Sequence, residues 1–567
     1  MPSIRAFYRI EFLYIFALVL ACALAFGGAL QLGFAPIDDF HLIVQNLAVR
    51  QMDLHSLQRV FTTYDPELYI PLTFLSFKTE ATIVGMHAWG FHLDSLILHI
   101  ASALLVAWII ARLSGSKIAG WCCAFLFAIH PLNTEAIVWL SARKDLLATF
   151  FALLSIASFL QSSDSKKKSW KISSIIFFLL ALLSKISVVL LPIVLFVIVR
   201  KHQTTRQAFV RTAPFFVLSL ILGIVALFGK TGALASTPFI DRMVLAGYAM
   251  SLSLWHMIIP IHLSLYYALP TMNATTVLIA LLPLLLLALA FFLKRRSPLI
   301  TLGILWFFVF ILPTVLNIQT DIRASGVTFA SDRYAYLPLI GLLIALSALL
   351  KKPYEKAVLT VAALVVVIFI PLAYAQVGTW KDAQSLFGHA VLTSPMSVQA
   401  RISLAETLKK EDRLQDAFNI LKDGLRYSDD ERLHLEAGIL YAAAGQVDQA
   451  DTEFLKARSI DANSAESYYG LGALQEHAGN LDHAKTFYEK AIQLEPNYPQ
   501  ARVALAQLLE QAGDRVGEES QLRTVLHYDD SNLDAINALA SLLQAEGENA
   551  EAITYQKQAA LLSQTSS

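Results

Sequence analysis

The sequence predicts an all-α protein, in which a polytopic membrane bundle of about 11 helices precedes an extramembrane α-solenoid. Of the 567 residues, 56% are hydrophobic and 16% are charged, and the mean hydropathy is +0.55. A soluble globular protein is less apolar than this. Long apolar stretches recur up to residue 375, where the pattern changes to a repeat of 34 residues.

Eleven apolar stretches are predicted to cross the membrane as helices, and several are shorter than the roughly 20 residues of a full span. They are residues 12–34, 91–111, 118–131, 146–160, 172–183, 187–199, 213–228, 275–293, 299–316, 334–350 and 357–375. The first is longer than the apolar core of a usual signal peptide, so we interpret it as a retained helix.

Basic residues lie at alternate ends of these stretches, among them Arg112 with Lys117 and Arg200 with Lys201. Short loops rich in Lys and Arg stay in the cytoplasm. The pattern therefore predicts that the C-terminal half is external. The odd number of crossings requires that the apolar segment 243–259 lies in the interface or re-enters.

The repeat is clearest from Ala465, where small and aromatic residues follow the tetratricopeptide order: Tyr468, Leu471, Gly472, Gly479, Ala484, Tyr488, Ala491 and Pro496. Related copies begin near Val398, Glu431, Pro499 and Leu533. We predict a membrane domain at 1–375, a connecting half-repeat at 376–397 and a tetratricopeptide-repeat domain of about five repeats at 398–567. The array is predicted to bind an extended peptide or a partner helix in its concave groove, and a rigid spacer or dimerisation surface is the alternative.

Charge and cysteine content exclude some classes of function. The formal net charge is zero, so no global basic excess points to nucleic acid as a partner. Cys22, Cys122 and Cys123 all lie in apolar stretches. They indicate neither a disulfide framework nor a cysteine metal site.

Two adjacent carboxylates, Asp38 and Asp39, follow the first predicted span. Fixed negative charge beside hydrocarbon is costly unless it performs a task. At the outer surface such a group could remove a proton from a substrate. One of the two could instead cap the helix that begins near Phe40. We predict one base and one orienting group, without deciding which is which.

Cations on three loops are predicted at the external mouth of the helices, against the usual charge rule: Arg143 with Lys144, Lys185, and Arg333. Arginine can donate two hydrogen bonds to a phosphate, whereas lysine supplies a mobile point charge. Three loops that bring cations to one face predict a shared phosphate site. The alternative is that these side chains only extend to ordinary lipid headgroups. Lys144 could equally pair with Asp145 or stay solvated.

Four motifs occur together. The segment from His130 reads His-Pro-Leu-Asn-Thr-Glu-Ala-Ile-Val-Trp-Leu-Ser-Ala-Arg-Lys-Asp-Leu-Leu-Ala, and the others are Asp38-Asp39, Leu183-Ser-Lys185 and Ser331-Asp-Arg-Tyr-Ala-Tyr-Leu-Pro338. In this order, with the repeats behind them, they resemble the transmembrane and tetratricopeptide-repeat O-mannosyltransferases. The resemblance extends over nearly the whole chain and implies a type C glycosyltransferase (GT-C) fold.

The resemblance implies that a sugar, mannose or a similar hexose, passes from a polyprenyl-phosphate carrier to hydroxyl groups of proteins outside the cytoplasm. Asp38 or Asp39 would then be the catalytic base, and Arg143, Lys185 and Arg333 would hold the carrier phosphate. A single displacement would invert the anomeric carbon.

Further residues are candidates for the substrate cavity: His41, His130, Glu135, Asp332 and Tyr336. His130 could equally be a local cap at a helix end. Asp38, Asp39 and His41 could offer ligands to a divalent metal, but their spacing does not favour one. We therefore expect no cofactor.

Other classes of function remain as alternatives. The acceptor could be a lipid or a glycan, or the chain could be a non-catalytic scaffold anchored in the membrane. A transporter is disfavoured because the predicted charges gather at one face instead of at mid-membrane depth. We expect a bacterial inner membrane with periplasmic repeats, or the endoplasmic-reticulum membrane with lumenal repeats in a eukaryote.

Overall fold

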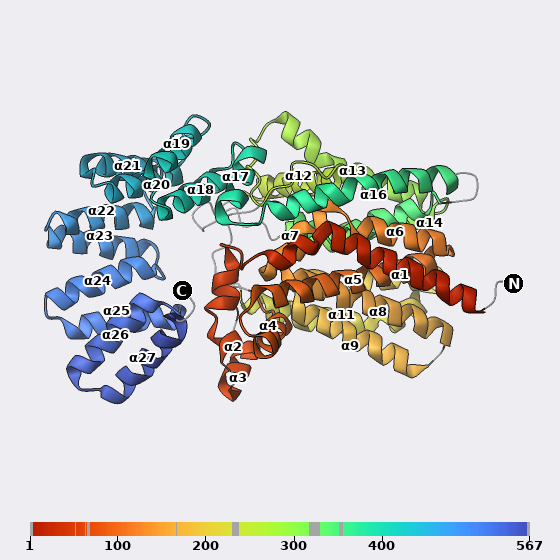
Figure 1. Cartoon of the computed structure of the whole chain (residues 1–567), viewed down its shortest axis with the longest axis horizontal. Coiled ribbons are helices and arrows are strands. Elements are labelled where there is room, and N and C mark those ends of the chain that lie inside the picture. The colour runs from red at the N-terminus through yellow and green to blue at the C-terminus, as the bar shows by residue number, and fades with distance from the viewer. Residues whose placement is uncertain are drawn as a thin grey trace. The chain divides into compact units, whose positions relative to one another are not determined.

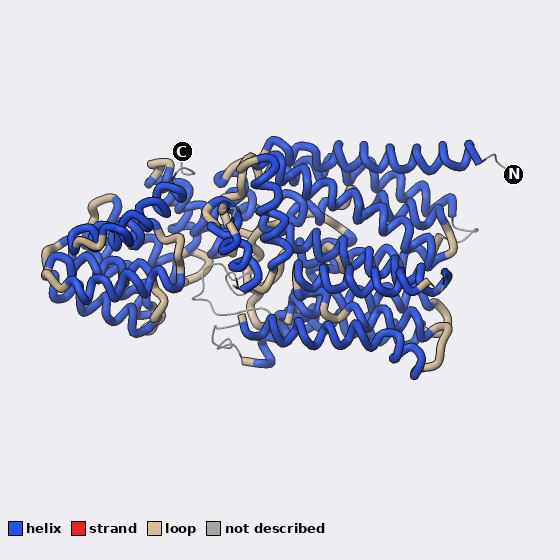
Figure 2. Tube along the Cα trace, turned by 90° about the horizontal axis from the view of Figure 1, so that it is seen from below, coloured by secondary structure: helices blue, strands red, loops and turns tan. Residues whose placement is uncertain are grey.

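The computed structural model describes residues 4–51, 53–62, 64, 68–165, 167–229, 238–316, 329–350 and 355–563. Within these ranges the chain is helical and contains no strand (Figure 2), which confirms the predicted all-α class. The chain forms two compact units, Met1–Ile43 with Ala48–Ser394 and Val44–Leu47 with Pro395–Ser567. The domain boundaries at 375 and 397 stay predictions.

The helices before residue 394 are labelled in part in Figure 1. They are α1 (Ile4–Phe26), α2 (Leu47–Arg50), α3 (Leu54–Thr62), α4 (Pro71–Val84), α5 (Ala88–Ser114), α6 (Lys117–Ala128), α7 (Thr134–Val138), α8 (Arg143–Ser165), α9 (Lys168–Ser184), α10 (Leu191–Arg200), α11 (Thr205–Phe228), α12 (Phe239–Ile258), α13 (Ala274–Leu293), α14 (Pro298–Val315), α15 (Leu339–Ser347), α16 (Glu355–Gly378) and α17 (Ala383–Thr393). Each apolar stretch predicted above overlaps one of them.

Several of these helices have the length and composition of membrane spans. Among the described residues seven qualify, and an eighth does if the bent pair Lys117–Ala128 and Pro131–Val138 is one span. Large apolar side chains point outward from them, with Leu227, Leu278 and Val367 68%, 69% and 70% exposed. Such surfaces require lipid as their solvent. The chain is therefore a membrane protein, and the count of about 11 spans stays a prediction.

Small residues allow these helices to pack closely. A Cβ atom added at Gly303 of α14 would come closer than 3.0 Å to backbone atoms of α15, and one added at Gly341 of α15 would come equally close to the backbone of α14. Helices α8 and α9 are joined by Ser155 and Ser174, whose hydroxyls each donate to the other's carbonyl at 2.8 Å. Close packing and polar bonds of this kind hold helices together in lipid.

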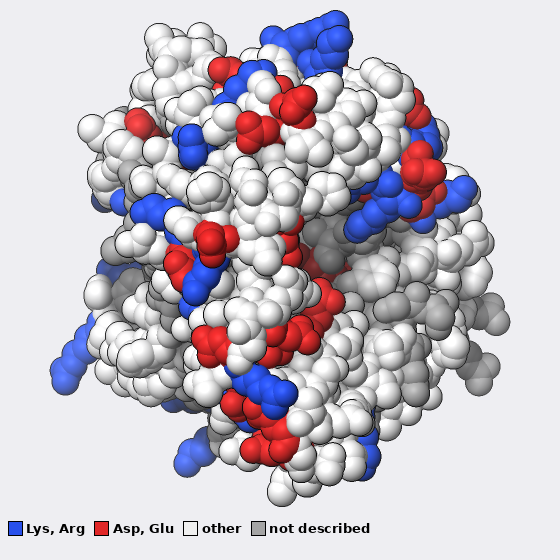
Figure 3. Space-filling model, turned by 90° about the vertical axis from the view of Figure 1, so that its left-hand side faces the viewer, with Lys and Arg blue, Asp and Glu red and all other residues white. Residues whose placement is uncertain are grey.

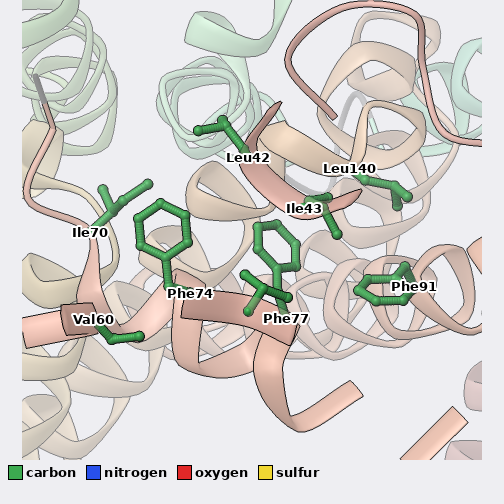
Figure 4. Close-up of a cluster of buried hydrophobic side chains, with 9 residues drawn as sticks. Leu42, Ile43, Val60, Ile70, Phe74, Phe77, Phe91 and Leu140 are labelled. Carbon is green, nitrogen blue, oxygen red and sulfur yellow. The ribbon is translucent and has the colours of Figure 1, made fainter. Parts of the chain in front are cut away.

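An apolar cluster fixes the loop that follows α1 (Figure 4). Leu42 and Ile43, which lie in the π-helical turn Phe40–Val44, pack with Phe74 and Phe77 of α4 and with Leu140. The amphipathic helix α3 and the helix α4 were not among the predicted elements. By burying this cluster they hold the segment just after Asp38 and Asp39 against the start of α8.

Up to residue 563, where the described part of the chain ends, the second unit contains five helix pairs. They are α18 (Val398–Lys410) with α19 (Leu414–Gly424), α20 (Glu431–Ala443) with α21 (Val447–Ile460), α22 (Ala465–His477) with α23 (Leu481–Leu494), α24 (Pro499–Gln511) with α25 (Arg515–Tyr528), and α26 (Leu533–Glu546) with α27 (Asn549–Ser563). The first helix of each pair begins at the residue predicted from the repeat. An α-solenoid is thereby confirmed as the fold of this unit.

The turn inside each pair needs a left-handed residue. Gly445, Gly479, Gly513 and Gly547 have φ of 72°, 77°, 76° and 86°. Glycine adopts this conformation without steric cost. In the first pair the same place is taken by Asp412, with φ of 60°.

Candidate active site

The structure separates the roles of the two adjacent aspartates. Asp39 is fully buried, and its carboxylate accepts bonds from the backbone N–H of Ala35 at 2.8 Å and from the N–H and hydroxyl of Ser141 at 2.7 and 2.5 Å. Asp38 is exposed. Asp39 thus fastens the loop to the turn Leu140–Ala142 that precedes α8, while the side chain of Asp38 stays accessible.

The pKa of Asp39 is raised from 3.8 to about 6, and burial is the largest cause. The bonds from Ser141 and Ala35 lower the pKa because they favour the ionised carboxylate, whereas the neighbouring charge of Asp38 contributes to the rise.

Lys185 and Arg333 lie together. Lys185 follows α9, and its Nζ pairs with Oδ1 of Asp145 at 2.6 Å. Arg333 lies in the 3₁₀ turn Asp332–Ala335, and its Nη1 pairs with Oε1 of Glu135 at 2.5 Å. Both cations pack against the ring of Tyr334, at 5.3 and 5.0 Å from its centroid. Two of the three cations predicted to hold the carrier phosphate therefore converge.

Lys144 joins this pair as a third cation. It is buried in the first turn of α8, and the charges of Lys185, Arg333, Asp38 and Asp145 act on it. Among the described residues no hydrogen-bond acceptor is placed against its ammonium group. Asp38 also acts electrostatically on Arg333. The exposed carboxylate and the three cations thus belong to one electrostatic cluster, which we call the Lys144 cluster: Asp38, Lys144, Lys185 and Arg333.

Two hydrogen-bond donors beside the Lys144 cluster have no partner among the described residues. They are Nε of Arg333 and Nε1 of Trp139, and both are buried. The guanidinium of Arg333 lies 4.2 Å from the ring centroid of Trp139. Buried polar groups are normally bonded, so these two donors and the ammonium of Lys144 fit an anion that accepts several hydrogen bonds.

Arg143 is placed differently from the prediction. It is fully buried, and its Nη1 pairs with Glu80 at 2.5 Å and with Asp94 at 2.8 Å. Its Nε donates to Ser95 and its Nη2 to the carbonyl of Phe91. In the described residues none of these partners belongs to the Lys144 cluster, so the guanidinium of Arg143 is bonded to a separate set of groups although Lys144 is its neighbour in the chain.

Most of the other predicted cavity residues are bonded within the protein. Glu135 accepts hydrogen bonds from Ser331 and Arg333, and Asp332 accepts them from His256 and Tyr267. His130 contacts the carbonyl of Met257, and the hydroxyl of Tyr336 is bonded to His99. The side chain of His41 is exposed. Glu135 thus positions Arg333 directly. In the part of the chain that the structure describes, no three His, Cys, Asp or Glu side chains are grouped as metal ligands.

Sequence reasoning did not single out Trp139, Ser141 or Tyr334 as part of the site. Trp139 and Ser141 lie inside the segment that begins at His130, and Tyr334 follows Arg333 directly. Their position in the quoted motifs was the available signal, but nothing in the sequence indicated their contacts.

A tetratricopeptide repeat model matches residues 465–498. Protein O-mannosyl-transferase F38B6.6 of Caenorhabditis elegans is 23% identical over 421 residues, 67% of this chain and 58% of that protein. Protein O-mannosyl-transferase Tmtc2 of Drosophila melanogaster is 39% identical over 16% of this chain and 10% of its own length. The solved structure of pilF from Pseudomonas aeruginosa is 19% identical, with a TM-score of 0.27, over 33% of this chain and 86% of that one.

The matched region thus covers little more than half of the nematode protein and a small part of the fly protein. Apolar helices, the repeat at 465–498 and these relatives agree with the predicted resemblance. The chain is a membrane protein with tetratricopeptide repeats that resembles the protein O-mannosyl-transferases.

Proposed function

We propose that this chain is an integral-membrane glycosyltransferase that moves a sugar from a polyprenyl-phosphate carrier to hydroxyl groups of protein acceptors. The observation that carries the proposal is the exposed carboxylate of Asp38 in electrostatic reach of Lys144 and Arg333, with Lys185 acting on the same Lys144. A base beside an anion-binding group is what such a transfer requires. The relatives named protein O-mannosyl-transferases support mannose and protein acceptors.

In the proposed reaction Asp38 takes the proton of the acceptor hydroxyl while the hydroxyl oxygen bonds to the anomeric carbon. The bond between this carbon and the phosphate oxygen breaks, and its electron pair leaves with polyprenyl phosphate. Lys144, Lys185 and Arg333 stabilise the charge that grows on the phosphate. A single displacement inverts the anomeric carbon. Asp39 acts as a positioning residue because its carboxylate is already bonded to Ala35 and Ser141.

Carboxylates hold two of the three cations in place. Glu135 holds the guanidinium of Arg333, and Asp145 holds the ammonium of Lys185. Each carboxylate neutralises one cation, which leaves the charge of Lys144 for the phosphate. We therefore place Lys144 in the phosphate site, where sequence reasoning had placed Arg143.

The test compares purified Asp38→Asn and Asp39→Asn with the parent chain, using a polyprenyl-phosphate sugar and a protein acceptor. Asp38→Asn should lower kcat by about 10²- to 10⁴-fold, the usual contribution of a general base, without changing donor affinity. Asp39→Asn should act mainly through thermal stability, because its amide would oppose the N–H of Ala35. Full activity of Asp38→Asn would exclude this residue as the base.

The acceptor and the compartment belong to the proposal as well. The repeats would bind the acceptor or an assembly partner on the extracytoplasmic side. The same assay distinguishes the alternatives: transfer to lipid or glycan but not to protein would change the acceptor class, and no transfer to any of them would leave a scaffold.

A further inference from the structure

The last three repeats enclose a cavity of about 620 Å³, which is within the range of ligand-binding sites. Helix α24 lines it with positions i, i+3, i+4 and i+7 counted from Gln500, and α26 does so with the same positions counted from Asp534. The two sets are one repeat apart. A cavity lined by the same face of successive helices is a groove that an extended chain can follow.

The groove is acidic. Glu510, Glu518 and Asp534 line it, and the lining residues that the structure describes include no Lys, Arg or His. Figure 3 shows acidic side chains near the middle of one face of the molecule, with Lys and Arg side chains among them. Like charges held close together repel one another unless a cation lies between them.

Glu518 is the most buried of the three acidic residues that line the groove. It lines the groove but is only 5% exposed, and its carboxylate has neither a hydrogen bond nor an ion pair within the described chain. A buried carboxylate without a partner is unfavourable. Its acidic neighbours in the groove cannot supply that partner.

The charge of Arg515, earlier on α25, acts on Glu518 and favours its ionised form, but Arg515 does not line the groove. A cation inside the groove would therefore belong to a ligand. A divalent ion is disfavoured because no three acidic or His side chains of the described chain are grouped to hold one. The ammonium or guanidinium of a peptide side chain can reach a carboxylate singly. The amides of Gln507 and Asn537, which also line the groove, can both donate to and accept from a peptide backbone.

We infer that this groove binds an extended peptide segment that carries Lys or Arg, with Glu518 and Asp534 as its counter-charges. The inference rests on the proposed role of the repeats in binding an acceptor or partner. It names the chemistry of that partner: a basic segment, in the acceptor protein or in an assembly partner.

The test measures binding of short labelled peptides to the purified full-length chain in nanodiscs, by fluorescence anisotropy and without any sugar donor. The probe alternates Ser and Lys. One matched peptide carries acetyl-lysine and another carries Glu at the same positions. Asp534→Asn is the principal variant because Asp534 is exposed, so its loss should not disturb folding. Glu489→Gln, whose side chain is 54% exposed on α23, is the control.

The Lys peptide should bind at least about tenfold more tightly than the acetylated and Glu peptides, because a desolvated charge pair is lost in both. Its affinity should fall as salt rises. Asp534→Asn and Glu518→Gln should weaken it severalfold, and Glu489→Gln should not. Equal binding of the Lys and acetyl-lysine peptides, or an affinity that Asp534→Asn leaves unchanged, would overturn the inference. So would preference for a neutral mannose oligosaccharide, which would make the groove a glycan site.

The two proposals fail separately. Peptide binding is measured without donor, so loss of sugar transfer in Asp38→Asn says nothing about the groove. An absence of peptide binding, with sugar transfer retained in the same preparation, would reject the basic partner and leave the glycosyltransferase proposal intact.

Discussion

The buried guanidinium of Arg143 ties α8 to α4 and α5 through Glu80 and Asp94. Burial raises the pKa of Glu80 to about 8, while the positive charge of Arg143 lowers it. Removal of the cation leaves two carboxylates close to each other without a counter-charge. We assign this residue to stability instead of phosphate binding.

Arg143→Ala should therefore destabilise the membrane unit by roughly 3–5 kcal/mol, the usual cost of removing one partner of a buried ion pair. Thermal unfolding of the detergent-solubilised chain measures this, and donor affinity of the folded fraction should not change. Lys117→Ala is the control because its pair with Glu11 is 62% exposed on the lysine side and surface pairs contribute little. Weaker donor binding at unchanged stability would return Arg143 to the phosphate site.

Glu436 in α20 is a second residue whose buried environment shifts its pKa. Burial raises its pKa to about 7, although the ammonium of Lys409 at 3.1 Å lowers it. Between its ordinary value of 4.5 and about 7, the folded chain then binds more protons than the unfolded chain. Stability from this group should therefore fall as pH rises through this window, by at most about 1.4 kcal/mol per pH unit.

Glu436→Gln should remove this pH dependence while its amide oxygen still accepts from Lys409. Hydrogen exchange of the α20 amides, corrected for intrinsic rates at each pH, provides the measurement. Glu489→Gln on the exposed face of α23 should retain the dependence of the parent chain. Identical profiles for Glu436→Gln and the parent would contradict the prediction.

At the scale of elements, each turn inside a helix pair requires a residue with left-handed backbone conformation. Gly479 has φ of 77°, and a Cβ there would meet no neighbouring atom. The cost of Gly479→Ala is therefore conformational alone, about 1–2 kcal/mol. Chemical unfolding of the repeat unit measures it. The reverse change at the equivalent place, Asp412→Gly, should cause no comparable loss of stability. Equal losses of stability in both variants would argue against left-handed backbone strain as the cause.

Elements were predictable where the signal is local. The repeat helices begin at Val398, Glu431, Ala465, Pro499 and Leu533 as predicted, because fixed spacing of small and aromatic residues specifies each pair. The apolar stretches became helices for a similar reason. Helices α3 and α4 were missed because the apolar cluster in which they pack is completed by residues outside both helices, and one of these, Leu140, is distant in sequence.

The site was predictable only in part for the same physical reason. Lys185 and Arg333 could be expected to share a face from topology alone. That Asp39 is buried and Asp38 exposed depends on Ser141, 102 residues away. The partners of Arg143 lie 63 and 49 residues earlier in the chain. Tertiary contacts over such separations leave no local pattern.

At the scale of the whole molecule, the two proposals place sugar transfer in the membrane unit and partner binding in the repeat unit. A chain lacking residues 398–567 should still transfer sugar to a short hydroxyl peptide at high concentration. Its kcat/KM for a protein acceptor should fall at least about tenfold, because a second contact raises the effective concentration of the tethered substrate. The ratio of the two rates measures the contribution of the repeats, and a ratio equal to that of the parent chain would show that the repeats do not select acceptors.

The regular spacing of the helix pairs has an evolutionary consequence. Since each pair rests mainly on its immediate neighbours, duplication of one such unit in the gene would lengthen the array by a single step and leave the sequence of the membrane helices unchanged. The array can therefore change in length without any substitution in the membrane unit.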